Sequence, residues 1–353
     1  MPAPRPRPSV AAIVAYRAGR PAGSDDLKLS SNENPYPPLP GVVERAAAIM
    51  SRVNRYPDAG LHDLYDALAG ATGLPRDRFA AGTGSVSVLF AAISAYCGPG
   101  DEVVVPWRSF EAYPLAVATA GARAVTVPLR ADATHDLAAM AEAVTDRTRV
   151  VLVCTPNNPT GPVVTHGDLE RFVAAVPDDV LVVVDEAYVE FVRPEDAASG
   201  LALLAAGHEN VLVLRTFSKA FGLAGLRVGY AIASADVAAT IRSVTPPFSV
   251  TDVAQAAAVA SLEAADELGR RVDAVVEQRQ VLVAGLRDQG WQVPDAQGNF
   301  VWLPLGEDAS AFAEAMQPVA VRPFAGEGVR VSVGLPEAND RFLDLAARWL
   351  TGR

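Results

Sequence analysis

Short apolar runs, rich in valine, recur through the middle of the chain. They do not alternate with polar residues, and this pattern predicts strands buried on both faces, as in a mostly parallel sheet. Helical periodicity lies between them, at residues 85–96 and 168–175 for example. Strands and helices that alternate in this way predict an α/β architecture. The runs span residues 103–105, 124–127, 150–153, 180–184, 211–214 and 228–232.

The last third of the chain has a different pattern. Residues 254–286 are rich in alanine, glutamate and arginine with a helical period, which predicts one long helical stretch. Strand and helix signals then follow one another at 300–303, 310–316, 329–333 and 340–350. We therefore expect a smaller α+β domain after the larger one. The predicted parts are an N-terminal arm (1–30), a large domain (31–250) and a small domain (251–353).

Composition narrows the class of protein. A chain of 353 residues is long enough for about two domains. Its formal net charge of −11 argues against a nucleic-acid partner. No apolar run is long enough for a membrane span, and residues 1–8 lack the apolar core of a secretory signal. Cys97 and Cys154 lie in apolar stretches, as expected of buried thiols in a reducing compartment, so we expect a cytoplasmic protein. No cysteine or histidine spacing suggests a metal site.

Lys219 carries the clearest candidate chemistry. It follows the apolar run 211–214 in the segment Thr216–Gly222, and Arg227 comes eight positions later. A lysine held in a dry pocket can attack a carbonyl, and an arginine can bind a phosphate in bidentate fashion. The pair therefore suggests a Schiff-base lysine beside a phosphate site, as pyridoxal phosphate requires. From this segment alone, a solvated lysine at a strand end is an equal alternative.

Two further strands end in polar residues. Residues 180–184 lead into Asp185 and Tyr188, and residues 150–153 lead into a Pro/Gly-rich turn that contains Asn158. Ligands of α/β proteins lie at this carboxyl edge, where a carboxylate can pair with a protonated pyridine nitrogen. The alternatives are a helix N-cap followed by a packed tyrosine for the first segment, and an ordinary loop for the second.

Three other features are weaker signals. Gly82-Thr83-Gly84-Ser85 precedes a predicted helix, so its backbone N–H groups suit a phosphate, although the segment does not fit the dinucleotide motif. Arg330 lies in an apolar strand and must either reach solvent or meet an anion such as a substrate carboxylate. Phe110 and Tyr113 follow another strand, where an aromatic ring can stack on a cofactor or pack in the core.

Taken in order, these segments resemble fold-type I pyridoxal-phosphate aminotransferases of the histidinol-phosphate aminotransferase-like group. The segments that carry the resemblance are Asn158–Gly161, Asp185–Tyr188, Ser218-Lys219 and Arg227, and it extends from Ser31 to Arg330. Residues 84–87, 107–111, 299–306 and 321–324 are similar to the actinobacterial aromatic amino acid aminotransferases, also called phenylalanine aminotransferases. Val86-Ser87 stands where histidinol-phosphate enzymes often have an acidic pair.

The resemblance implies an aspartate aminotransferase-like fold, with a mostly parallel seven-stranded sheet flanked by helices in the large domain. It also implies a role for each matching residue toward pyridoxal 5'-phosphate. Lys219 would form the Schiff base, Asp185 would pair with the pyridine nitrogen, and Asn158 and Tyr188 would contact the ring oxygen. The phosphate would be held by Ser218, Arg227 and the backbone of Ser85 and Val86, with Phe110 stacked on the ring.

The substrate contacts are implied in the same way. Arg330 would bind the substrate carboxylate with help from Asn32, and Tyr16 in the N-terminal arm would close over the substrate. Tyr56 would reach the cofactor phosphate of the neighbouring subunit, which implies a homodimer with shared active sites.

The expected reaction is ping-pong transfer of an amino group between an aromatic amino acid and 2-oxoglutarate. The main alternative is histidinol-phosphate aminotransferase. Two other classes share this fold: regulatory modules fused to DNA-binding helices, which the acidic composition disfavours, and lyases or decarboxylases, which Arg330 disfavours because it suits a retained carboxylate.

Overall fold

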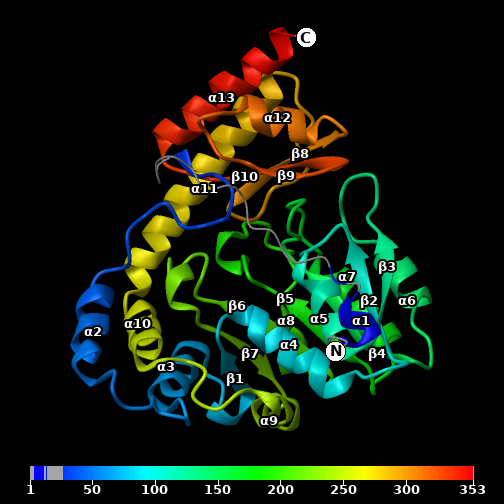
Figure 1. The fold of residues 1–353 in the computed structure, drawn as a ribbon, viewed down its shortest axis with the longest axis vertical. Coiled ribbons are helices and arrows are strands. Elements are labelled where there is room, and N and C mark those ends of the chain that lie inside the picture. Colours follow the sequence, from blue (N-terminus) through cyan, green and yellow to red (C-terminus); the bar gives the residue numbers. More distant parts are fainter. Residues whose placement is uncertain (1–3, 12, 14–26, 353) are drawn as a thin grey trace.

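The protein is described by a computed structural model, which covers residues 4–11, 13 and 27–352. A large sheet with helices on both faces forms the lower part of the molecule in Figure 1, and a small sheet with its own helices forms the upper part. The long helix α11 (Ala265–Asp288) runs between the two parts. Among the described residues, no helix combines the length and the apolar character that a membrane span needs.

The large sheet has seven strands in the order β1-β7-β6-β5-β4-β2-β3. Neighbouring strands are parallel except where β7 pairs, antiparallel, with β1 and β6. This confirms the predicted mostly parallel α/β sheet. The strands are β1 (Phe79–Gly82), β2 (Glu102–Trp107), β3 (Arg123–Pro128), β4 (Thr148–Cys154), β5 (Leu181–Asp185), β6 (Val211–Thr216) and β7 (Gly229–Ala233).

Valine-rich strands fit this sheet because helices cover both of its faces. Successive residues of a strand point to opposite faces, so Val103 and Val105 pack in one core cluster and Val104 packs in the other. The helices of the first cluster are α4 (Ser85–Tyr96), α5 (Ala112–Ala120) and α9 (Ala235–Val244). Those of the second include α6 (Leu137–Glu142), α7 (His166–Ala175) and α8 (Gly200–Ala205).

The strands differ from the sequence-based expectation in two details. Residues 124–127 were expected to be buried on both faces, but β3 is the edge strand and most of its residues are half-buried or exposed. The short strand β1 had no counterpart in the sequence analysis, because its Phe-Ala-Ala-Gly segment lacks β-branched residues.

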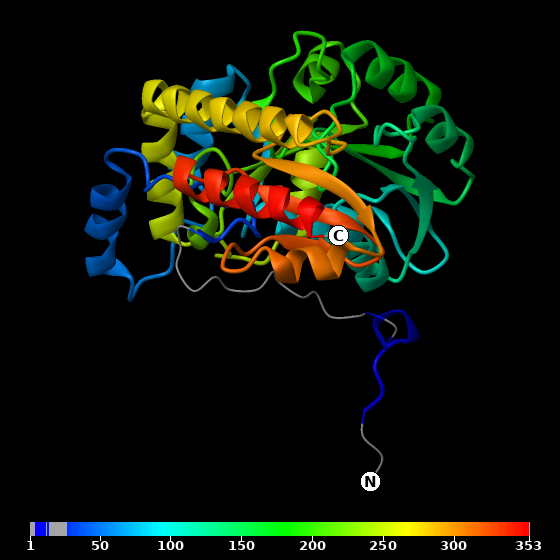
Figure 2. The ribbon, with the colours of Figure 1, turned by 90° about the horizontal axis from the view of Figure 1, so that it is seen from above.

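The smaller sheet is antiparallel, in the order β8-β10-β9. Its strands are β8 (Phe300–Gly306), β9 (Arg322–Phe324) and β10 (Glu327–Ser332), and its helices include α12 (Ala309–Ala315) and α13 (Pro336–Thr351). Figure 2 shows α13 and α11 side by side over this sheet. The N-terminal segment also reaches it, since Lys28 forms a bridge with Ala320. The predicted domain boundaries stay a prediction.

The single helical stretch expected over 254–286 is two helices. α10 (Asp252–Glu263) and α11 meet at Ala264, whose backbone leaves the helical region with ψ at 33°. α10 packs on α2 (Val42–Ile49) and α3 (His62–Thr72), while α11 continues toward the small sheet. The helical period continues through the junction, so the sequence pattern did not mark the break. The remaining α-helix of the described residues is α1 (Pro8–Ala11). Short 3₁₀ helices lie between the other elements.

Candidate active site

A cavity of about 450 Å³ opens at the carboxyl edge of the large sheet. Three adjacent strands deliver residues to it: β4 precedes the turn with Asn158, β5 ends at Asp185, and β6 precedes Lys219. Arg330 reaches the same cavity from the small sheet. The lining contains these predicted site residues: Ser85, Val86, Phe110, Asn158, Asp185, Tyr188, Ser218, Lys219, Arg227 and Arg330.

Lys219 is half-buried in this cavity rather than fully solvated at a strand end. Its Nζ donates to the backbone oxygen of Asn32 at 3.2 Å and to that of Ser31 at 3.4 Å. Burial is the main cause that lowers the pKa of Lys219 to about 7, and the positive charge of Arg330 lowers it further. The amine is therefore poised to be neutral near physiological pH, as a nucleophile or general base requires.

Asp185 is buried in the same cavity and accepts two hydrogen bonds. The Tyr113 hydroxyl donates to its Oδ2 at 2.8 Å, and the backbone N–H of Ala187 donates to its Oδ1 at 3.2 Å. Burial raises the pKa of Asp185 to about 6, and the Tyr113 bond opposes this shift. A cation beside the carboxylate would favour its ionised form. Tyr113 therefore belongs to the Asp185 site rather than to a stacking position.

The hydroxyl of Tyr188 joins the two sides of the cavity. It accepts hydrogen bonds from the side-chain amides of Asn32 at 3.0 Å and Asn158 at 3.2 Å. Ser332 holds Asn32 in turn. The Ser332 hydroxyl accepts a hydrogen bond from the backbone N–H of Asn32 and donates one to the Asn32 side-chain oxygen. The φ of Asn32 is 51°, a left-handed conformation that asparagine tolerates better than most residues. Asn32 therefore acts beside the cavity, through Tyr188, and does not line it.

Arg330 is buried at 9% exposure, so the solvent-exposed alternative for this residue was wrong. Its guanidinium donates to the side-chain oxygen of Asn158 at 2.7 Å and to the backbone oxygen of Ser30 at 2.9 Å. These two acceptors orient the guanidinium within the cavity. A buried cation held in this way suits a carboxylate ligand in the same cavity.

The opposite end of the cavity has the features of a phosphate site. α4 begins after Gly84 without a side-chain cap, so its first N–H groups face outward from the helix end. Arg227 lies beside this end and donates to the Ser218 hydroxyl at 3.2 Å. Its φ of 56° is left-handed, a conformation that costs on the order of 1 kcal/mol or more and is retained mainly at functional sites. A Cβ on Gly84 would lie 2.7 Å from the Arg227 guanidinium, and one on Gly229 would lie 2.2 Å from the Ser85 nitrogen, so both glycines permit this close approach.

Among the described residues, two predicted residues do not line this cavity: Asn32, which lies beside it, and Tyr56. Tyr56 is 81% exposed and stacks on Phe248 with ring centroids 4.7 Å apart, so any active-site contact it makes lies outside this single chain. Tyr16 lies outside the described residues. Three further lining residues carry no signal in the sequence: Ser30, Phe90 and Leu115. Phe90 and Leu115 add apolar lining, and nothing in the local pattern distinguishes the three from core or loop residues.

The fold and the cavity define a class of protein: an α/β enzyme in which a lysine, a carboxylate and two arginines meet at one sheet edge. Comparison with known proteins identifies the family. The family model for class I and II aminotransferases matches residues 24–344, and the chain belongs to this family. Its fold is the fold-type I, aspartate aminotransferase-like fold, and its activity is that of an aminotransferase.

Curated relatives and solved structures agree with this family. An aromatic amino acid aminotransferase of Streptomyces avermitilis is 55% identical over 351 residues, with 98% of both chains covered. One of Mycobacteroides abscessus is 51% identical, with 99% of this chain and 100% of that protein covered. The crystal structure of histidinol-phosphate aminotransferase from Sinorhizobium meliloti in complex with pyridoxal-5'-phosphate has a TM-score of 0.88 at 27% identity, with 98% of both chains covered.

Proposed function

We propose that the protein transfers the amino group between an aromatic amino acid and 2-oxoglutarate, with pyridoxal 5'-phosphate as its cofactor. The observation that carries this proposal is the single cavity in which the amine of Lys219, the carboxylate of Asp185 and the guanidinium of Arg330 meet. The names of relatives at about half identity support the aromatic substrate.

The residues of the cavity fit the proposed cofactor. The start of α4 at Ser85 and Val86, with Ser218 and Arg227, would hold the phosphate, and Lys219 would hold the aldehyde carbon. At the ring, Asp185 would contact the pyridine nitrogen, Asn158 and Tyr188 the ring oxygen, and Phe110 the ring face. When bound, the cofactor supplies an electron sink for the carbon from which the substrate proton leaves.

The protein's own residues would then position the substrate and move one proton. Arg330 orients the carboxylate, so the α-carbon faces the Lys219 amine. Because its pKa is about 7, this amine can accept the α-proton and later return it. Asp185, ionised beside a cation, would stabilise positive charge at the pyridine nitrogen. The amino acid and the oxo acid would use the same cavity in turn, which predicts ping-pong kinetics.

The apolar part of the lining supports an aromatic side chain. Val86, Phe90, Phe110 and Leu115 line the cavity, and apolar walls select substrates by shape and buried area. A phosphate group on the substrate would need additional donors. We expect kcat/KM for phenylalanine with 2-oxoglutarate to exceed that for histidinol phosphate at least about tenfold, a difference of about 1.4 kcal/mol. Turnover of both donors, measured side by side, tests this; a preference for histidinol phosphate would support that alternative activity instead.

We also propose a homodimer in which Tyr56 completes the partner's active site. Tyr56 and Phe248, which stack on each other, are both exposed large aromatic side chains, and exposed apolar pairs of this kind are typical of a protein contact.

A mixed dimer of Lys219→Ala and Tyr56→Ala chains tests the shared site. Each variant alone should be impaired. For Tyr56→Ala we expect the cofactor affinity to fall roughly tenfold, because one hydrogen bond to a charged group is lost. If the sites are shared, one site of the mixed dimer keeps both residues and regains normal cofactor affinity. A mixed dimer with no site better than those of the Tyr56→Ala homodimer would contradict the proposal.

A further inference from the structure

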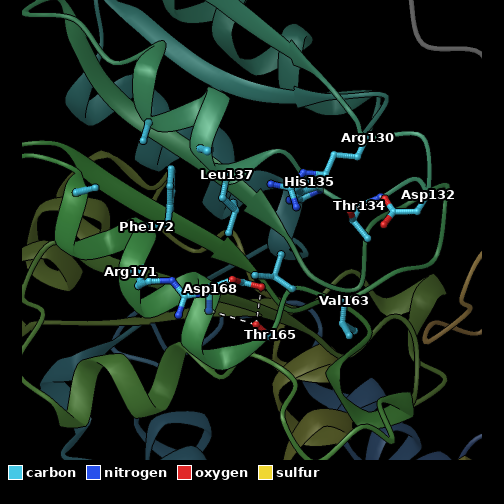
Figure 3. Close-up of a pocket in the computed structure, with 14 residues that line it drawn as sticks. Arg130, Asp132, Thr134, His135, Leu137, Val163, Thr165, Asp168, Arg171 and Phe172 are labelled. Atoms are coloured by element: carbon cyan, nitrogen blue, oxygen red, sulfur yellow. Dashed lines mark hydrogen bonds and ion pairs between the residues drawn. The ribbon is translucent and has the colours of Figure 1, made fainter.

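A second cavity, of about 420 Å³, lies on the α6 and α7 side of the large sheet (Figure 3). The loop 130–135, α6 and α7 form its walls. It shares no lining residue with the catalytic cavity. Its volume is at the lower end of the range of about 300–1,000 Å³ that ligand sites occupy, so it suits a small molecule.

The lining divides into an apolar part and a charged rim. Leu137, Val164 and Phe172 belong to the apolar part, with several alanines around them. The rim carries two cations and two anions, Arg130, Arg171, Asp132 and Asp168. Arg171 is paired with Asp168, while Arg130 is paired with Asp136 outside the lining, at 3.4 Å. Because the rim carries both signs of charge, a ligand with both charges is favoured over a simple anion or cation.

His135 is the unusual residue of this lining. It is buried at 5% exposure, and neither ring nitrogen completes a hydrogen bond within the described residues, although the Asn157 side chain is close enough to act on its pKa. Burial lowers the pKa of His135 to about 4, so the ring is neutral at pH 7 and offers one donor and one acceptor. Buried polar groups without a partner cost about 1–3 kcal/mol and usually have a functional explanation.

The walls of this cavity are connected to the active-site turn. The backbone oxygen of Ala133 accepts a hydrogen bond from the Thr160 hydroxyl, which also accepts one from the Asn157 side chain. Asn157 is the polar neighbour that acts on the pKa of His135, and it precedes Asn158 in the chain. A ligand that contacts His135 would therefore be connected, through Asn157, to Asn158. Asn158 in turn bonds to Arg330 and Tyr188 in the catalytic cavity.

We propose that this second cavity binds a zwitterionic amino acid with an apolar side chain. The rim carboxylates receive the ammonium group, an arginine receives the carboxylate, and the apolar lining receives the side chain. His135 makes a hydrogen bond to a polar atom of the ligand. The site differs from the catalytic one in holding the amino acid without reaction, because its lining contains no lysine.

Equilibrium dialysis of the holoenzyme with α-methyl-L-phenylalanine tests the proposal. This probe lacks the α-hydrogen that transamination removes, so it is not consumed. Occupancy of the active site is followed separately by the visible absorption of the cofactor. We expect the wild type to bind one equivalent per chain beyond the equivalent that changes this absorption. A failure of the aromatic specificity proposed above would leave the absorption unchanged but would not remove the additional equivalent.

Two adjacent exposed alanines of α7 provide a matched pair of variants. Ala175 lines the cavity and Ala174 does not. Ala175→Trp should abolish the additional equivalent, whereas Ala174→Trp should keep it; both should retain the wild-type absorption change. No additional equivalent in the wild type, or equal binding by both variants, would overturn the site.

His135→Phe tests the role of the histidine, because it keeps a ring of similar shape and removes the hydrogen bond. We expect the affinity of the additional equivalent to fall about tenfold, as for one hydrogen bond to a charged group. Unchanged affinity in a folded His135→Phe protein would overturn the contact with His135.

Discussion

The two ends of the catalytic cavity are built in different ways. At the lysine end, Ser218, Lys219 and Arg227 come from one continuous segment, and Arg227 bonds to Ser218 nine residues away. At the carboxylate end, which is the end proposed to bind the substrate carboxylate, Arg330 bonds to Asn158, 172 residues away, and to Ser30, 300 residues away. The first end depends on a local turn after a strand, and the second depends on the docking of the small sheet against the large one.

The lysine end carries the groups proposed to react, whereas the Arg330 end carries those proposed to bind the substrate. The local segment brings Ser218, Lys219 and Arg227 together by itself, and the start of α4 and the backbone oxygens of Ser31 and Asn32 complete this end. The carboxylate site exists only when the small sheet, the N-terminal segment and the Asn158 turn are in place together. Substitutions at the lysine end should therefore abolish the reaction, whereas those at the carboxylate end should mainly weaken substrate binding.

Removal of the lysine should have the largest effect. Lysine occurs at only two positions of the chain, 28 and 219. Lys219→Ala should lower kcat by about 10⁴-fold or more, because general base catalysis alone contributes up to about that factor. The protein should stay folded, with cofactor bound but not covalently attached.

Lys28 is the internal control for this experiment. Its Nζ pairs with Glu33 at 2.9 Å at the surface. Reduction of the holoenzyme with borohydride and mass analysis of its peptides should place the cofactor on Lys219 and leave Lys28 unmodified. Attachment at Lys28, or near-normal turnover by Lys219→Ala, would contradict the proposed chemistry.

Arg330→Gln should have the next largest effect, and on substrate binding. Loss of a buried charged partner costs about 3 kcal/mol, so kcat/KM should fall roughly a hundredfold, mainly through KM. Arg322→Gln is the matched control, because Arg322 lies opposite Arg330 on β9 and is paired with Glu111 at 2.9 Å. It should lose no more than about tenfold. An equal loss in both variants would show that the effect is not specific to the carboxylate contact.

The same variant should change the pH profile. The wild-type rate should fall as pH decreases through about 7, where Lys219 gains a proton. The positive charge of Arg330 helps to keep this pKa low. Without that charge the pKa rises, so the acid limb of kcat should move to higher pH in Arg330→Gln. A limb at unchanged pH would remove Lys219 from the titration.

The comparison also explains what the sequence could predict. Valine runs predicted the parallel strands, and the polar residues after them predicted Asn158, Asp185 and Lys219 at one sheet edge, because parallel strands end together. Burial of Arg330 could not be decided, since its partners Asn158 and Ser30 lie 172 and 300 residues away along the chain. Asn32, which contacts Tyr188 rather than lining the cavity, was placed only by resemblance. No local pattern indicated that Tyr113 would reach Asp185, 72 residues away.

Tyr113→Phe should have the smallest of these effects. It removes one hydrogen bond to Asp185 and keeps the buried ring, so kcat should fall about tenfold with KM nearly unchanged. The Tyr113 bond lowers the pKa of Asp185, so its loss should raise that pKa above about 6 and favour the protonated carboxyl. The acid limb should therefore move to higher pH. In an Asp185→Asn background the substitution should have little further effect, because groups that act through one another are not additive. Equal losses in both backgrounds would show that Tyr113 acts through packing and not through the carboxylate.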